Sequence, residues 1–348
     1  MTNLYVFWRL VTDPPSPWAR LTRTNQYLRF NATPANHWGQ TGAVTHAHPS
    51  VSGFSEGNAV FATSWSDING HSTPLENVMG LHNDHAAPGS YSINNNNNNP
   101  AGLGLDIIYV DMATWESSIR SFPEGSIIMS NGALVDASLE RYSAADGKYI
   151  YHSTPESEVG TSTPQSHTVA GTLGSAIGLS AVQAYSGVHT AGDRSISHAH
   201  TFSLASEAKY VEPRNLVTRL YEATRKTSRA LKDTVVFVDG SVGANWEILT
   251  GWAGGNLKGG NSDPTLSGSD THTQTFSGNS TTRSSENYFQ RKSGALVKVT
   301  AYDSHYHVVS GTLDAANHVP SSRLIVPARL VKTLSKQRTS APQIIGLW

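Results

Sequence analysis

The sequence predicts a mainly β protein with few helices, in which three tandem units form a pseudo-threefold arrangement. Charged residues make up only 15% of the chain and hydrophobic residues 38%, while glycine, serine, threonine and asparagine are abundant. This balance favours short strands joined by turns over a helical bundle. The second observation is a set of matching phrases that recurs three times, and self-similarity of this kind indicates repeated structural units.

Each unit opens with an apolar run of the kind that forms a strand. In the third run, Val236 and Val238 alternate with Phe237, which is the period of two expected of a strand. The three runs are LYVFWRLV at Leu4–Val11, DIIYVDM at Asp106–Met112 and TVVFVDGSV at Thr234–Val242.

Histidine-containing turns set the register of the repeat. A proline follows the second turn of each unit, at Pro100, Pro213 and Pro320. The chain therefore divides into three repeats at 1–105, 106–233 and 234–348. The first turns are Thr45–Gly53, Pro164–Gly171 and Asp270–Gly278, and the second turns are Leu81–Gly89, Ile196–Ser203 and Asp303–Gly311.

One helix is predicted, at Glu212–Lys232 (212–232) in the second repeat. Pro213 suits the first helical turn, and apolar residues recur from Leu216 to Leu231 at roughly helical spacing. The six asparagines at Asn94–Asn99 predict an irregular loop that is not a site. The run Gln343–Trp348 resembles the opening strand and is expected to complete a sheet begun at the N-terminus.

Composition argues against several classes of protein. The formal net charge is −1, so there is no general electrostatic attraction to nucleic acid. Cysteine is absent, which excludes disulfides, thiolate zinc sites and cysteine nucleophiles. The apolar N-terminus is interrupted by Arg9 and lacks a cleavage site, so we expect no signal peptide, and no run is long enough for a membrane span.

A glycine- and tryptophan-rich stretch in the third repeat carries a resemblance to a known family. It reads GSVGANWEILTGWAGGNLKGGNSDPTLSGSDTHTQTFSG from Gly240, and it is similar to the tail-collar type of phage fibre proteins. Ala244 and Asn245 stand where that family has proline-x-glycine. The other repeats keep the pattern more faintly, at Pro14–Phe30 and Phe122–Gly132. The residues in comparable places are Gly240, Trp246, Gly251, Trp252, Gly255, Leu257 and Gly259.

The resemblance implies a structural virion protein of a tailed phage and carries no catalytic residues with it. Such a tail collar, fibre or tip component would be made in the host cytoplasm and act in the virion, in particle assembly or host attachment. Its expected partners are other virion proteins and a host surface receptor or glycan. Two alternatives stay open: a carbohydrate-binding or carbohydrate-cleaving module, and a capsid-decorating protein.

The second turns predict a metal site, because residues i and i+2 of a strand point to the same face. Two of the pairs have this spacing, whereas His82 and His85 are three residues apart, which departs from strict ligand geometry. On a pseudo-threefold axis the three pairs would offer six imidazoles to an iron or other transition-metal ion, and some fibres that the chain resembles hold iron with such pairs. The alternative is structural, with histidines that hydrogen-bond the backbone or each other. The six candidates are His82, His85, His198, His200, His305 and His307.

The first turns are the weaker metal candidates in sequence. His46 and His48 form a pair, but His167 and His272 each stand alone, with Gln165 and Gln274 opposite them. We therefore expect this set to be structural or only weakly metal-binding.

No enzyme motif stands out in the sequence. There is no phosphate-binding glycine loop, nucleophile elbow or His-Glu-x-x-His segment. Glu56 follows the His46 and His48 pair at too great a distance for a cupin pattern, and the other pairs have no acid at a comparable place. Motifs that recur in every unit indicate a structural role, because an active site is seldom needed in triplicate. We therefore expect no enzymatic activity.

Overall fold

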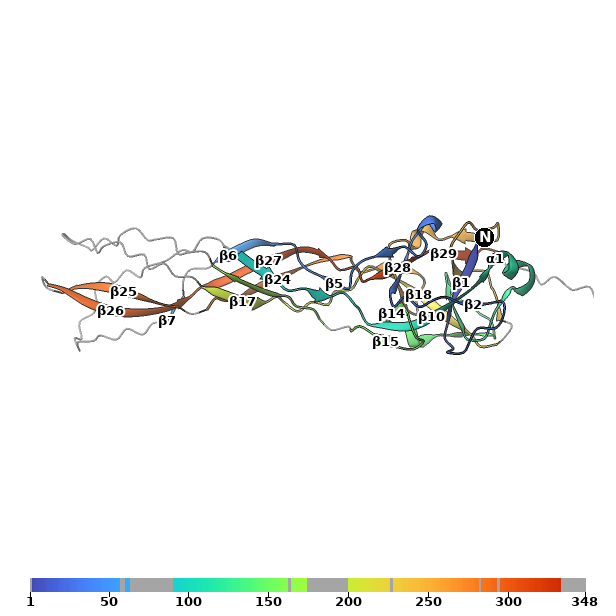
Figure 1. Ribbon diagram of the computed structural model, residues 1–348, viewed down its shortest axis with the longest axis horizontal. Helices are drawn as coiled ribbons and strands as arrows, with labels where there is room; N and C mark the ends of the chain where they lie inside the picture. The colour runs from blue at the N-terminus through green and yellow to red at the C-terminus, as the bar shows by residue number, and fades with distance from the viewer. Residues whose placement is uncertain are drawn as a thin grey trace, which may run out of the picture.

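The computed structural model describes residues 2–56, 60–62, 90–161, 164–173, 200–225, 228–281, 283–292 and 295–332, and these form a mainly β structure. The predicted fold class is confirmed in this respect. A bulb at one end carries the N-terminus, and a long, thin shaft extends from it (Figure 1). Among the described residues the only α-helix is α1 (Met112–Thr114), which continues into the single turn η2 (Trp115–Ile119).

The bulb is one sheet of sixteen strands. Its strands are β1 (Asn3–Trp8), β2 (Ala19–Arg20), β3 (Tyr27–Phe30), β4 (Gln40–Thr41), β10 (Gly102–Asp111), β12 (Ser126–Ser130), β13 (Leu139–Arg141), β14 (Tyr149–His152), β15 (Glu158–Val159), β18 (Asn215–Ala223), β20 (Thr234–Val238), β21 (Trp246–Ile248), β22 (Asn256–Gly259), β23 (Thr265–Ser267), β28 (Ser322–Ile325) and β29 (Pro327–Leu330). The three apolar opening runs are thus strands β1, β10 and β20, as predicted.

Two apolar cores lie on opposite faces of the central strands. Along β1, Leu4 and Val6 belong to one buried cluster, whereas Tyr5 and Phe7 belong to the other. Successive side chains of a strand point to opposite faces, so a strand buried on both sides is apolar at nearly every position. This explains why the opening runs are continuous and not strictly alternating.

One three-strand arrangement occurs three times in the bulb. A parallel pair is extended on its other side by a short antiparallel strand in the sets β14–β10–β15, β22–β18–β23 and β3–β28–β4. Strands β14, β22 and β3 also pair with one another. Strand β10 crosses the predicted boundary at 105, and all three sets share one sheet. The division into three superposable tandem units stays a prediction.

The prolines that follow the second turns lie at the same place in each set. Gly160, Gly268 and Gly42 have φ values of +66°, +74° and +75°, and a Cβ on each would lie 2.1, 2.5 and 2.2 Å from the carbonyl oxygens of Pro100, Pro213 and Pro320. Only glycine permits such a close backbone approach at positive φ. The spacing of these prolines in sequence therefore reflects a repeated contact between strands.

Among the described residues the shaft contains three three-stranded sheets, each combining distant parts of the chain (Figure 1). A small buried cluster, comprising Val169, Leu173, Phe202, Phe276, Val309 and Leu313, forms its apolar core. The sheets are β8 (Ser90–Ile93) with β16 (Thr168–Thr172) and β17 (Thr201–Ala205), β6 (Val51–Glu56) with β24 (Thr271–Asn279) and β27 (Val308–Asn317), and β7 (Val60–Ala62) with β25 (Arg283–Lys292) and β26 (Ala295–Tyr306). The two-stranded pairs are β5 (Thr45–His46) with β9 (Asn96–Asn97), and β11 (Ser121–Phe122) with β19 (Ser228–Arg229).

The predicted helix at 212–232 is wrong, because residues 215–223 form strand β18. This strand pairs with β12, β13 and β22, and these ladders satisfy its backbone on both sides. The strand predicted at Gln343–Trp348 lies outside the described residues. Across the part of the chain that is described, no helix has the length and apolar character needed to cross a membrane.

Candidate metal centre

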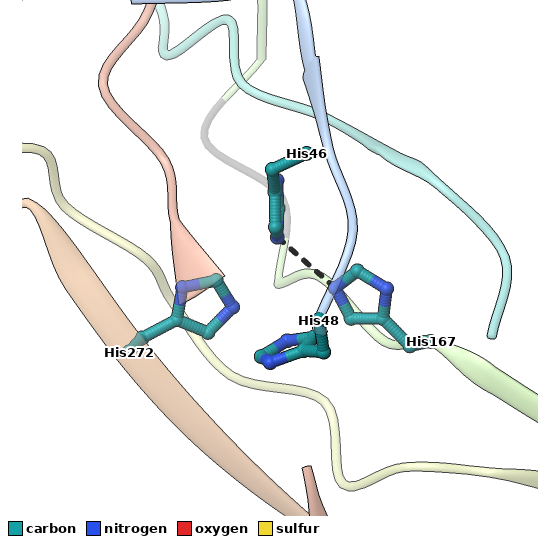
Figure 2. Close-up of side chains that lie close together, drawn as sticks. All are labelled: His46, His48, His167 and His272. Atoms are coloured by element: carbon teal, nitrogen blue, oxygen red, sulfur yellow. Dashed lines mark hydrogen bonds between the residues drawn. The ribbon is translucent and has the colours of Figure 1, made fainter. Parts of the chain in front are cut away.

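Four histidines of the first turns converge where the shaft meets the bulb. One nitrogen from each of His46, His48, His167 and His272 lies within 4.8 Å of the others, and all four side chains are buried. Figure 2 shows the four rings directed toward one another from separate stretches of chain. His46 ends β5, His48 follows it, His167 immediately precedes β16, and His272 lies in β24. All three predicted repeats therefore contribute to one site.

The asparagine tract Asn94–Asn99 is part of the scaffold of this site. Asn96 and Asn97 form β9, which pairs with the strand that carries His46. The carbonyl of Asn94 accepts a hydrogen bond from His167 Nδ1 at 3.0 Å, and its Oδ1 accepts one from the Thr168 amide at 2.6 Å. The expectation of an irregular loop without a role in a site is therefore wrong. Local composition does not show that Asn96 and Asn97 pair with β5, a strand about fifty residues earlier in the chain.

Backbone contacts determine the tautomer of two of the rings. His48 Nδ1 lies 2.5 Å from the carbonyl oxygen of Asp314, and His167 Nδ1 makes the contact with Asn94. A carbonyl can only accept, so each Nδ1 carries the proton and each Nε2 keeps a lone pair. Metal-ligating histidines are commonly oriented by this kind of second hydrogen bond.

Two inward nitrogens have no hydrogen-bond partner among the described residues. These are Nε2 of His48 and Nε2 of His272, both fully buried. A buried polar atom without a partner is costly, and a metal ion bound between the rings would satisfy it. The donor set therefore fits a metal ion.

The spacing of the rings is close to what one ion requires. His46 Nε2 and His167 Nε2 lie 3.1 Å apart, as the dashed line in Figure 2 marks. Metal–nitrogen bonds of about 2.0–2.1 Å limit two ligands of one ion to a separation of about 4.2 Å. The group reaches 4.8 Å at its widest, so binding requires only a small inward shift of a ring. Without metal, His46 Nε2 would donate its proton to His167.

Burial keeps the rings in the form that binds metal. It lowers the pKa of His46 to about 4 and that of His272 to about 3, and it also lowers the pKa of His167. The coulombic effect of the neighbouring histidines acts in the same direction. These three imidazoles are therefore neutral at pH 7, so a metal ion need not displace protons from them.

At this level of the shaft, two glutamines stand where a second histidine would complete a His-x-His pair. Gln165 precedes His167 by two residues, and Gln274 follows His272 by two. The Gln274 side chain accepts from Ser206 Oγ at 3.1 Å and donates to the Gln165 carbonyl at 2.7 Å, so it is engaged elsewhere. Four imidazoles suit zinc, copper, nickel or iron.

The structure brings together two of the six histidines predicted from the second turns. His200 and His307 are buried, and their ring centroids lie 4.9 Å apart. His200 Nδ1 donates to the Thr281 carbonyl at 2.7 Å. His305 lies on β26 with its side chain outside the described part, and His82, His85 and His198 lie outside the described residues altogether. The six-histidine site stays a prediction.

The first turns, the weaker metal candidates in sequence, supply the four-histidine group of the structure. The first turns hold fewer His-x-His pairs, yet their lone histidines occupy the same register as the pair at His46 and His48. That shared register was the signal that could have identified the four-histidine group. Comparison of the chain with protein-family models, with curated proteins and with solved structures found no match.

Proposed function

We propose that this chain is a structural protein of a tailed-phage particle, acting as a tail collar, fibre or tip component in assembly or host attachment. The bulb would join the particle, and the shaft would project from it. A transition-metal ion would fasten the shaft at the four-histidine group. Other virion proteins and a host receptor or glycan are the proposed partners, and the proposal includes no catalytic role.

The observation that supports the proposal most is a buried, multi-segment histidine group in an elongated β shaft. Among the described residues the buried apolar cluster of the shaft comprises six members, so their hydrophobic burial is small beside that of the bulb. A metal ion held by His46, His48, His167 and His272 would link all three predicted repeats through one point. Metal binding that joins distant segments adds directly to folding free energy, which suits a thin projection exposed to mechanical load.

Elemental analysis of the purified full chain tests the metal part of this proposal. We expect about one equivalent of iron, zinc, nickel or copper per chain after removal of loosely bound ions. The His48→Ala and His167→Ala double variant should lose it. His37→Ala is the control, because His37 is a half-buried histidine that lies among bulb aromatics, away from the four-histidine group. Equal metal content in all three proteins, or none in the wild type, would refute the metal centre.

Immunogold imaging of intact particles tests the virion part. Antibodies against the bulb segment 2–30 and the shaft segment 271–281 should label the tail, with the shaft label farther from the particle axis. Label on the capsid would instead support a decorating protein. Particles without any label, from lysates in which the chain is abundant, would refute a virion role.

A further inference from the structure

A cavity of about 520 Å³ opens on the shaft beside the four-histidine group. Its wall includes His272 and His318, together with Tyr210, Ser269 and Ala315. The wall does not include His46, His48 or His167. Tyr210 is 70% exposed, so this side of the group faces solvent.

His272 differs from the other three histidines in what its Nδ1 faces. The Nδ1 of His48 and that of His167 are held by backbone carbonyls, whereas His272 Nδ1 lies 3.3 Å from His318 Nδ1. The two rings meet edge to face with centroids 4.9 Å apart. His318 is only 2% exposed, and its Nε2 has no hydrogen-bond partner among the described residues.

We infer that this cavity is the entrance to the metal centre and that His318 passes a hydrated divalent transition-metal ion between the cavity and the four-histidine group. The inference rests on the metal part of the proposed function. It adds that the ion exchanges through the folded shaft, whereas a closed structural site would release its ion only when strands separate.

The chemistry of entry explains why a histidine is useful at this position. An ion in the cavity must lose its waters one after another before it reaches the buried group. An imidazole can replace one water at a time, so His318 offers a first nitrogen ligand at the wall and the inward Nε2 of His272 offers a second. The ion then moves onto the remaining rings, and His318 returns to its contact with His272. His46 lies farther away, with its ring centroid 6.3 Å from that of His318.

The test measures both the equilibrium and the rate of Co²⁺ binding to the metal-free full chain, by the visible absorption of the bound ion. His318→Phe keeps an aromatic ring but removes both nitrogens. Ala315→Trp places a bulky side chain in the cavity mouth, at an exposed position of β27. Val308→Trp, exposed on the same strand and not part of this cavity wall, is the matched control. Circular dichroism and thermal unfolding verify that each variant is folded.

We expect Co²⁺ affinity within about threefold of wild type in all variants. Uptake and chelator-driven release should both slow at least tenfold in His318→Phe and Ala315→Trp, and remain unchanged in Val308→Trp. Rates within twofold of wild type in both test variants would overturn the entrance, as would a tenfold loss of affinity in His318→Phe, which would make His318 a permanent ligand. Failure of the wild type to bind Co²⁺ at all would instead refute the metal centre itself.

Discussion

At the scale of single residues, His37 shows how burial alone can make a side chain sensitive to pH. Its ring packs against Tyr5 and Trp38, with centroid distances of 5.2 and 4.3 Å. Neither ring nitrogen has a hydrogen-bond partner among the described residues. Burial lowers the pKa of His37 to about 4, although the charge of Asp239 acts in the opposite direction.

This environment predicts a specific loss of stability in mild acid. An unfolded histidine has a pKa of about 6.5, so between pH 6.5 and 4 the unfolded chain binds a proton that folded His37 does not. The free energy of unfolding should therefore fall as the pH is lowered through this window, by up to about 3 kcal/mol from this residue. Urea unfolding of wild type and His37→Phe at pH 7, 5.5 and 4 measures the difference.

The neighbouring carboxyl group of Asp239 does not titrate in this pH window, so it does not affect the comparison. Burial would raise the pKa of Asp239, but hydrogen bonds from Tyr5 and Asn3 outweigh burial and hold it below its usual value. Asp239 therefore stays ionised across the window, and the buried histidines of the shaft titrate alike in both proteins. If the free energy of unfolding falls equally with pH in wild type and in His37→Phe, the prediction is contradicted.

At the scale of secondary-structure elements, strand β18 shows why local spacing misled the prediction of a helix. Leu216 and Leu220 are four residues apart, which matches one face of a helix but equally one face of a strand. Thr218 between them is also fully buried, which only the strand explains. Burial does alternate from Leu216 to Leu220, but the polar Thr218 occupies the middle buried position, so the period of two is not visible in the sequence. Its partners come from distant parts of the chain, so the sequence window could not reveal them.

The glycine-to-proline contacts between strands give a prediction at the same scale. In Gly160→Ala the new Cβ would lie 2.1 Å from the Pro100 carbonyl oxygen at a positive φ, so backbone must move. We expect a loss of about 2–4 kcal/mol in the free energy of unfolding, measured with urea. Gly132→Ala is the control, since its Cβ would meet nothing within 4 Å and its φ is not in the positive range. Equal stability of the two variants would contradict the repeated contact.

At the scale of the whole molecule, the bulb and the shaft depend on different sources of stability. Within the described part of the chain, the bulb has two extensive apolar cores, whereas the shaft has a small cluster and the histidine group. Hydrophobic stabilisation is roughly proportional to the apolar area buried, so the shaft should be the weaker part. A ligand that binds only the folded shaft raises its stability by mass action.

Metal should therefore raise the unfolding temperature of the shaft selectively. With Co²⁺ or Zn²⁺ at a hundred times the dissociation constant, the folded shaft should gain about 2.7 kcal/mol. Calorimetry should show the lower-temperature transition moving upward with metal concentration, while the upper transition stays in place. The His48→Ala and His167→Ala double variant should show no shift. A shift of equal size in that variant would mean that the ion binds elsewhere.

The mainly β class, the three opening strands and the register of histidines and prolines can be predicted from local periodicity and turn chemistry. Three features cannot be predicted in this way: the strand at residues 215–223, the role of the asparagine tract in a site, and the meeting of His46, His48, His167 and His272. Each of these depends on pairing between segments far apart in the chain. Such pairing places side chains at distances that no local spacing encodes.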